Sequence, residues 1–204
     1  MRKPRLKEKQ PTSSNSIVQV FGGPWSLIKT AMVDEYIRFF NAALKNMPFE
    51  RVYIDAFAGS GAFRWVVGAP KNTLFGPYDE TKDIHAGSAQ RALTVDPPFQ
   101  RIFFIEQDET NAQALEQLIA KTQHPNARVL VGDANQILRK LCESKKWKTR
   151  RGVIFLDPFG MNVEWSTLQL IANTKALDLW FLFSIGGLIR DEVERHVLVK
   201  QIGH

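Results

Sequence analysis

Short apolar runs alternate with amphipathic stretches along most of this chain. Five runs are too short for helices and rich in β-branched and aromatic residues, as strands are. They cover residues 52–57, 101–106, 128–131, 152–156 and 178–183. Apolar residues spaced three and four apart predict helices at 25–46, 88–95, 109–123, 134–142 and 165–174. Because apolar strands separated by helices indicate a parallel sheet buried on both faces, we predict an α/β fold with a Rossmann-like, doubly wound, mainly parallel sheet.

One segment, residues 63–86, interrupts this alternation after the first strand. A strand-to-helix connection usually takes about 2–6 residues, so this glycine- and proline-containing stretch is predicted to be an insertion at the mouth of the sheet. It is either a substrate contact or a variable surface loop. Residues 1–16 are polar and basic and predict a disordered tail, which leaves one domain at 17–204.

The composition excludes several classes of protein. Cys142 is the single cysteine, so neither an intrachain disulfide nor a multi-cysteine zinc site is available. No apolar run approaches the roughly 20 residues of a membrane helix. The basic, polar amino end does not resemble a secretory signal, and a cytoplasmic location is therefore the expectation.

The positive charge is concentrated in two segments. The formal net charge is +6, of which residues 1–16 carry +4 and residues 139–151 carry +6, so the remainder is net negative by 4. These basic patches are either solvated surface or contacts for the phosphate backbone of a nucleic acid.

The first strand ends in the sequence Asp55–Ala–Phe57–Ala–Gly59–Ser–Gly61. In an open α/β sheet, ligands bind beyond the carboxyl ends of the strands, and the two glycines allow the backbone to turn sharply there. Arg64 stands where a dinucleotide fingerprint would have its third glycine. This loop therefore suits a nucleoside with a neutral or cationic tail better than a pyrophosphate.

Acidic residues also follow the next two strands. Glu106 ends the second run, where a ribose diol is commonly bound, and lies 45 residues after Gly61. Without the 24 residues of the insertion, this spacing is 21, close to the usual value of about 20. Asp133 follows the third run and suits a contact to an adenine amino group, a helix N-cap, or both, while Asp108 suits a cap.

The fourth strand ends in Asp157–Pro158–Phe159–Gly160. The carboxylate of Asp157 and the carbonyl of Pro158 are two neighbouring acceptors, which suit an exocyclic amine with its two hydrogens. Phe159 can stack on a flat ring, as aromatic residues do on an extruded base. The alternative is a proline-braced turn in which Asp157 acts as a cap.

Together these strand-tip elements resemble the class I S-adenosylmethionine-dependent methyltransferases, and most closely the three-Cys-motif partner (TcmP) family. The resemblance rests on Gly22–Gly23–Pro24–Trp25, on residues 53–61, on Gly87–Ser88, on Phe104–Ile105–Glu106 and on Leu156–Asp157–Pro158–Phe159–Gly160. It implies a methyltransferase-type fold, an S-adenosylmethionine site and pairing with a protein that carries a three-cysteine motif.

The resemblance also implies a role for each strand-tip residue. Asp55, Phe57, Gly59 and Gly61 would line the methionine end of the cofactor, Glu106 would hold its ribose and Asp133 its adenine. The carboxylate of Asp157 and the carbonyl of Pro158 would accept hydrogen bonds from the target amine, and Phe159 would stack on the target ring. Amino-methyltransferases of nucleic acids usually carry two prolines before the aromatic residue, whereas this chain has one.

We therefore predict a methyltransferase acting on an amino group of a nucleic acid or nucleotide. The alternative is a non-catalytic or cofactor-binding partner subunit of a three-cysteine-motif protein, in a phage-defence or mobile-element system. Five strands can be traced, against seven in the class that the chain resembles. The expected domain is thus a cofactor-binding core whose carboxyl part, beyond the fifth strand, is missing, minimised or supplied by a partner.

Overall fold

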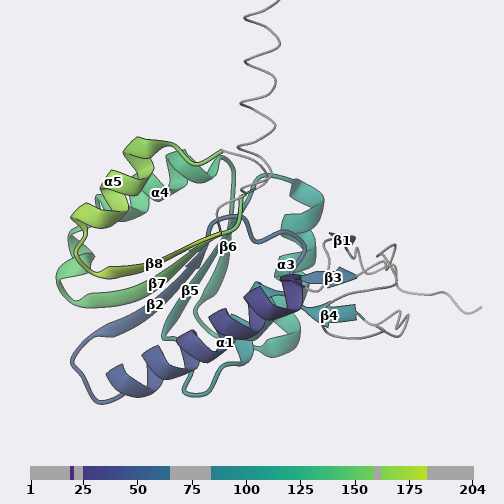
Figure 1. Cartoon of the computed structure of the whole chain (residues 1–204), viewed down its shortest axis with the longest axis horizontal. Helices are drawn as coiled ribbons and strands as arrows, with labels where there is room; N and C mark the ends of the chain where they lie inside the picture. Colours follow the sequence, from purple (N-terminus) through teal and green to yellow (C-terminus); the bar gives the residue numbers. More distant parts are fainter. Residues whose placement is uncertain (1–18, 21–24, 65–83, 159–161, 183–204) are drawn as a thin grey trace, which may run out of the picture.

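The computed structural model describes residues 19–20, 25–64, 84–158 and 162–182 (Figure 1). Within these residues the main sheet has five strands, and all four neighbouring pairs run parallel. The strand order across the sheet is β6 (Ala127–Val131), β5 (Arg101–Glu106), β2 (Glu50–Asp55), β7 (Arg150–Leu156) and β8 (Leu177–Phe181). The chain thus winds outward from β2 to one edge and then returns to wind outward from β7 to the other. This is the doubly wound, Rossmann-like order predicted from the sequence.

Helices cover both faces of the sheet, as the predicted parallel strands require. α1 (Trp25–Leu44), α2 (Ser88–Thr94) and α3 (Glu109–Thr122) pack on one face, and α4 (Ala134–Cys142) and α5 (Trp165–Asn173) on the other (Figure 1). Each of the five predicted helices is present, with ends that differ from the prediction by no more than two residues. None of the described helices is long and apolar enough to cross a membrane.

In the described part of the chain, two hydrophobic clusters form the core, one on each face of the sheet. Tyr53 and Phe104 belong to the cluster beneath α1–α3, while Ile54 and Ile154 belong to the cluster beneath α4 and α5. Side chains alternate between the faces because the pleat of a strand has a period of two. Gly152 is needed at the centre of this packing, since a Cβ there would lie 2.8 Å from the carbonyl oxygen of Val52.

A second, three-stranded sheet lies beside the main one and was not expected from the sequence. β3 (Ala62–Arg64) pairs antiparallel with β4 (Ile84–Ala86), and β1 (Gln19–Val20) pairs parallel with β3. The pairing of β3 with β4 brings the two ends of the predicted insertion together beside the end of β2. The predicted tail at 1–16 and the interior of the insertion lie outside the described residues.

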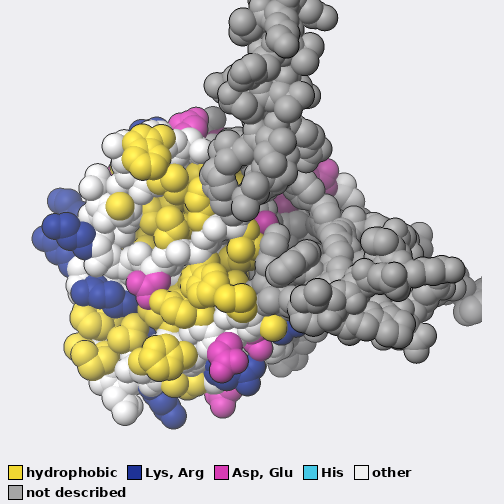
Figure 2. Space-filling view, viewed as in Figure 1, with side chains coloured by type: hydrophobic (Ala, Val, Ile, Leu, Met, Phe, Trp, Pro, Cys, Tyr) yellow, Lys and Arg dark blue, Asp and Glu magenta, His cyan; other side chains and the backbone are white. Residues whose placement is uncertain are grey.

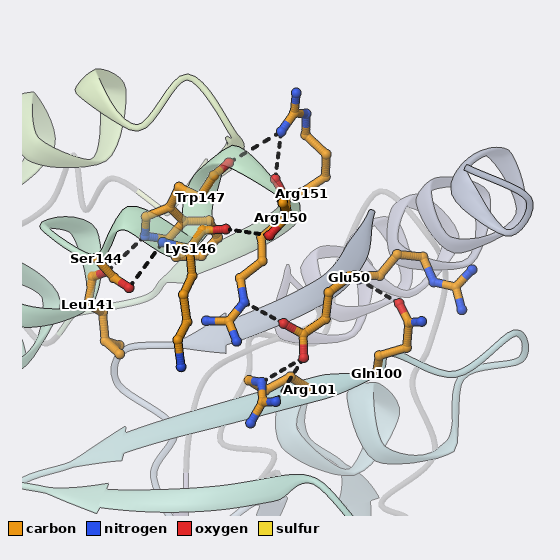
Figure 3. A network of polar contacts seen from close by, with 11 residues as sticks. Glu50, Gln100, Arg101, Leu141, Ser144, Lys146, Trp147, Arg150 and Arg151 are labelled. Carbon is orange, nitrogen blue, oxygen red and sulfur yellow. Dashed lines mark hydrogen bonds and ion pairs between the residues drawn. The ribbon is translucent and has the colours of Figure 1, made fainter. Parts of the chain in front are cut away.

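An ionic network joins the amino ends of three strands (Figure 3). Glu50, the first residue of β2, accepts hydrogen bonds from Arg101 of β5, at 2.9 Å, and from Arg150 of β7. Burial raises the pKa of Glu50, but the hydrogen bonds and charges of the two arginines outweigh it and lower the pKa below its ordinary value. Part of the basic segment 139–151 therefore serves to hold the sheet together.

Candidate functional site

The carboxyl ends of β2 and β7 mark the point at which the strand order reverses. Asp55 is the last residue of β2, and the backbone N–H of Ala56 donates to the carbonyl of Phe155 at 3.0 Å, so the two strands stay paired up to their tips. Asp157 follows β7 directly. In doubly wound sheets this reversal point is where ligands bind. The acidic residues predicted from the first and fourth strands thus lie at the favoured end of the sheet.

The glycine turn after β2 has the backbone conformation that its sequence suggested. Gly59 and Gly61 have φ values of +59° and +79°, which residues with a side chain rarely adopt. A Cβ on Gly61 would also lie 2.8 Å from Cδ2 of Leu118 and 3.2 Å from Cδ2 of Leu115, both on α3. Gly61 is therefore needed for the turn to pack against α3 as well as for its dihedral angle.

Glu106 connects this turn to the tip of the neighbouring strand. One carboxylate oxygen accepts from the backbone N–H of Gly59 at 2.8 Å. The other accepts from the N–H groups of Gln107 and Asp108, both at 2.9 Å. The carboxylate thus fixes the position of the glycine turn relative to β5. A carboxylate offers about four acceptor positions, so some capacity remains on the oxygen bonded to Gly59.

Asp55 is completely buried, with no exposed surface. One of its oxygens accepts from the hydroxyl of Ser88 at 2.6 Å, and the other from the N–H of Phe57 at 3.4 Å. Burial raises the pKa of Asp55 to about 7; the bonds from Ser88 and Phe57 oppose the increase, and the negative charges of Asp157 and Glu106 add to it. The carboxyl group therefore changes its charge near neutral pH.

The predicted N-caps are present at both helices that follow the acidic tips. Asp108 accepts from the N–H of Asn111 at the start of α3, and Asp133 accepts from the N–H of Gln136 at the start of α4. Capping and ligand binding are compatible at Asp133, because its second oxygen lies outside this bond. The capping role is observed, whereas the adenine contact stays a prediction.

The residues after β7 combine an exposed acid with a buried proline. Asp157 is exposed and Pro158 is buried. Phe159 and Gly160 lie outside the described residues, so the predicted stacking stays a prediction. The described part of the following loop is held by Asn135 of α4, whose side chain donates to the carbonyl of Asn162 at 2.9 Å and accepts from the N–H of Glu164 at 3.0 Å.

The structure thus brings Asp55, Gly59, Gly61, Glu106 and Asp157 to one region, with Asp133 at the tip of the outermost strand on the β6 side. The contributions of Ser88 and Asn135 were not predicted from the sequence. Ser88 belongs to the Gly87–Ser88 pair of the family resemblance, but nothing in the sequence indicates its partner. Among the described residues there is no cluster of three or more histidine, cysteine or acidic side chains that could hold a metal ion.

The strand order and these strand tips define a Rossmann-like, doubly wound α/β protein. No protein-family model matches the chain, and no curated protein matches it. Solved structures with a similar arrangement include a candidate methyltransferase, YhhF, from Escherichia coli, with 19% identity over 73% of this chain and a TM-score of 0.39. The match spans 62% of the length of that chain.

Two further solved structures are also similar. A candidate methylase from Haemophilus influenzae has 18% identity over 74% of this chain and 74% of its own, with a TM-score of 0.40. A candidate RNA methyltransferase from Pyrococcus horikoshii has 13% identity over 88% of this chain and 75% of its own, with a TM-score of 0.41.

Proposed function

We propose that this chain is an S-adenosylmethionine-dependent methyltransferase that acts on an amino group of a nucleic acid or nucleotide. One observation carries the proposal. At the reversal point of the sheet, a glycine turn is bonded through Gly59 to the acidic tip of the next strand, Glu106, and an exposed acid, Asp157, follows the strand on the other side. This arrangement supplies a backbone turn for a nucleoside and an acceptor for a substrate on neighbouring strands.

The acidic character of this edge fits a cationic cofactor. Glu106 retains acceptor capacity for a ribose hydroxyl, Asp133 retains an oxygen for an adenine amine, and Asp55 adds negative charge behind the turn when it is ionised. When bound, S-adenosylmethionine supplies a methyl group activated by a sulfonium. The protein's own contribution is then to bind and orient, which needs neither a histidine nor a metal.

Asp157 is the residue that we assign to the target amine. Its exposed carboxylate can accept a hydrogen bond from the N–H of the amine and so direct the nitrogen lone pair. Pro158, which is buried, fixes the backbone next to it and offers its carbonyl as the second acceptor. Phe159 is proposed to stack on the target ring.

The position of the basic segment distinguishes long substrates from short ones. Lys145, Lys146 and Lys148 are exposed at the amino end of β7, whereas Asp157 follows its carboxyl end. Seven residues of strand separate these ends by about 20 Å. A polynucleotide can contact both, but a mononucleotide cannot. Replacement of the three lysines by glutamine should therefore weaken binding of an oligonucleotide, in a salt-dependent manner, and leave the use of a mononucleotide unchanged.

The direct test is titration calorimetry with S-adenosylmethionine, followed by transfer of a labelled methyl group to RNA, DNA and nucleotides. We expect Asp157→Ala to abolish transfer while leaving cofactor binding nearly intact. Asp96→Ala is a matched control, because Asp96 is also an exposed aspartate before a proline but precedes β5 at the opposite end. Absence of cofactor binding at millimolar concentration would refute the proposal, and unchanged transfer by Asp157→Ala would refute the role of that residue.

An exposed apolar face favours a second function, that of a partner subunit for a three-cysteine-motif protein. Hydrophobic side chains gather over β8 and α1 (Figure 2). Phe39 of α1 is 71% exposed, Trp165 of α5 is 72% exposed and Leu179 of β8 is 41% exposed. Apolar side chains exposed beside an edge strand are typical of protein contacts. Cofactor binding without methyl transfer, together with a complex that Leu179→Lys disrupts, would favour this function.

A further inference from the structure

We infer that Ser88 is a positioning residue for Asp55, holding the buried carboxylate in one orientation and stabilising its charged form. The Ser88 hydroxyl donates to Asp55 at 2.6 Å, the length of a strong, charge-assisted bond. The only other hydrogen bond found for this carboxylate within the described residues comes from the N–H of Phe57 at 3.4 Å, which is long and weak. The hydroxyl is therefore the stronger donor.

The fold places Ser88 here although 33 residues separate it from Asp55. Ala62 of β3 is paired with Ala86 of β4, and the N–H of Gly87 donates to the carbonyl of Gly61 at 3.2 Å. These contacts return the chain to the glycine turn after the insertion. Ser88 then begins α2, whose Ala89 and Ala92 are buried against the sheet. The hydroxyl is thus fixed by a strand pair on one side and a packed helix on the other.

The other groups around Asp55 make this hydroxyl important. Asp157, after β7, and Glu106, at the tip of β5, are acidic and disfavour a further negative charge. Tyr53, on the same strand, is fully buried, and its burial and the charge of Asp55 both raise the pKa of its hydroxyl. None of these groups is a cation, so within the described part of the chain the charged form of Asp55 depends on hydrogen bonds. Without Ser88, the carboxyl group should hold its proton to higher pH.

The consequence for ligand binding rests on the proposed function. If Asp55 supplies negative charge behind the turn, a cationic cofactor should bind more weakly whenever Asp55 is protonated. Ser88 would then set the pH above which the cofactor binds well. The effect on the Asp55 proton itself requires no cofactor, so the two parts can be measured separately.

The experiment follows the carboxyl carbon of Asp55 by NMR in cofactor-free protein, across pH 5 to 9, with Asp55→Asn to assign the signal. We expect Ser88→Ala to raise the Asp55 midpoint by about one pH unit or more. Ser88→Thr keeps a hydroxyl and should restore the midpoint towards that of the unmodified chain. Thr94→Ala is the matched control: it removes another hydroxyl of α2, one that donates to the carbonyl of Gln90, and should leave the midpoint unchanged.

Calorimetry on the same variants completes the test. At pH 7, Ser88→Ala should bind S-adenosylmethionine more weakly by about fivefold or more, and most of the loss should be recovered at pH 9. In the Asp55→Asn background, Ser88→Ala should have no further effect on affinity. A raised midpoint without cofactor binding by the unmodified chain would support Ser88 and refute the proposed function. Normal cofactor binding with an unchanged midpoint in a folded Ser88→Ala protein would refute Ser88 and keep the proposed function.

Discussion

Glu106, at the tip of β5, accepts a hydrogen bond from the backbone N–H of Gly59 in the turn after β2, at 2.8 Å. This contact spans 47 residues and fixes the glycine turn against the neighbouring strand. The same carboxylate binds the N–H groups of Gln107 and Asp108. One side chain therefore sets the geometry of two strand tips, whether or not a ligand is present.

We expect Glu106→Gln to destabilise the protein by about 1–3 kcal/mol. Glutamine has one acceptor oxygen, and its amide nitrogen cannot accept, so either Gly59 or the pair of N–H groups loses its acceptor. Urea unfolding would measure the loss. Glu109→Gln is the control, since Glu109 is an exposed acid in the first turn of α3 and should contribute only a few tenths of a kcal/mol. Equal effects of the two substitutions would contradict the bridging role of Glu106.

Asp55 should make the protein less stable as the pH rises through the acidic range. Its pKa is raised to about 7 in the folded chain, against an ordinary value near 4. Between these values the folded chain binds a proton that the unfolded chain has released. The free energy of unfolding therefore falls as the pH rises from about 4 to 7, and above pH 7 this loss stays constant. Asp55→Asn removes the dependence.

We therefore expect Asp55→Asn to be more stable than the unmodified chain at pH 8, by about 1–3 kcal/mol, and to have nearly the same stability at pH 4. Urea unfolding of both proteins across this range is the measurement. If the difference between them did not vary with pH, the carboxylate would not be titrating as its burial requires. The same substitution should weaken cofactor binding under the proposed function, so that stability and activity would change in opposite directions.

Glu50 should show the reverse dependence on pH. The bonds from Arg101 and Arg150 lower its folded pKa, so its contribution is present above its unfolded pKa, near 4, and is lost as the pH falls through the lower folded value. We expect Glu50→Gln to cost about 1–2 kcal/mol at pH 7, because the ion pairs are partly buried and join three strands.

The control for Glu50 is Arg38→Gln, because Arg38 is an exposed side chain whose ion pair with Asp34 lies within α1, and Asp34 keeps its second pair with Arg91; this substitution should cost less than about 0.5 kcal/mol. Thermal unfolding of both variants at pH 7 and pH 3 is the measurement. The Glu50→Gln deficit should shrink at the lower pH. A deficit that stayed constant would mean that packing, rather than charge, joins the amino ends of the strands.

The sequence was sufficient to predict the five strands and five helices of the main fold because their signals are local. A run such as Ile102–Ile105 is apolar at every position, as a strand buried on both faces must be. β1, β3 and β4 have two or three residues each and depend on pairing between distant segments, so no local pattern indicates them.

The same distinction explains the site. The acids at the strand tips could be predicted because each lies at the end of its strand or within two residues after it. The contact of Ser88 with Asp55 could not, since the length and pairing of the insertion decide which residue returns to the end of β2. The burial of Asp55, and hence its raised pKa, is likewise a product of tertiary packing. The ionic network of Glu50 requires the strand order, which the sequence suggests only through the rules of the fold.

Asn41 provides a test of core packing at the amino end of the sheet. It lies in α1 with no exposed surface, and neither polar atom of its side chain meets a partner among the described residues. An amide buried in this way costs about 1–3 kcal/mol. Leucine has a similar volume and a higher helix propensity. We therefore expect Asn41→Leu to stabilise the protein by about 1–2 kcal/mol, measured by urea unfolding.

The control for Asn41 is Asn173→Leu at the exposed end of α5, where the same exchange removes no buried amide and should change stability by less than about 0.5 kcal/mol. Arg51 lies next to Asn41. Its guanidinium donates to the main-chain carbonyl of Asn41 at 3.5 Å, and its buried Nε atom has no described partner. A destabilised Asn41→Leu protein would show that the Asn41 amide is hydrogen-bonded in solution. Arg51 would then be the first partner to test, because its buried Nε–H also has no acceptor among the described residues.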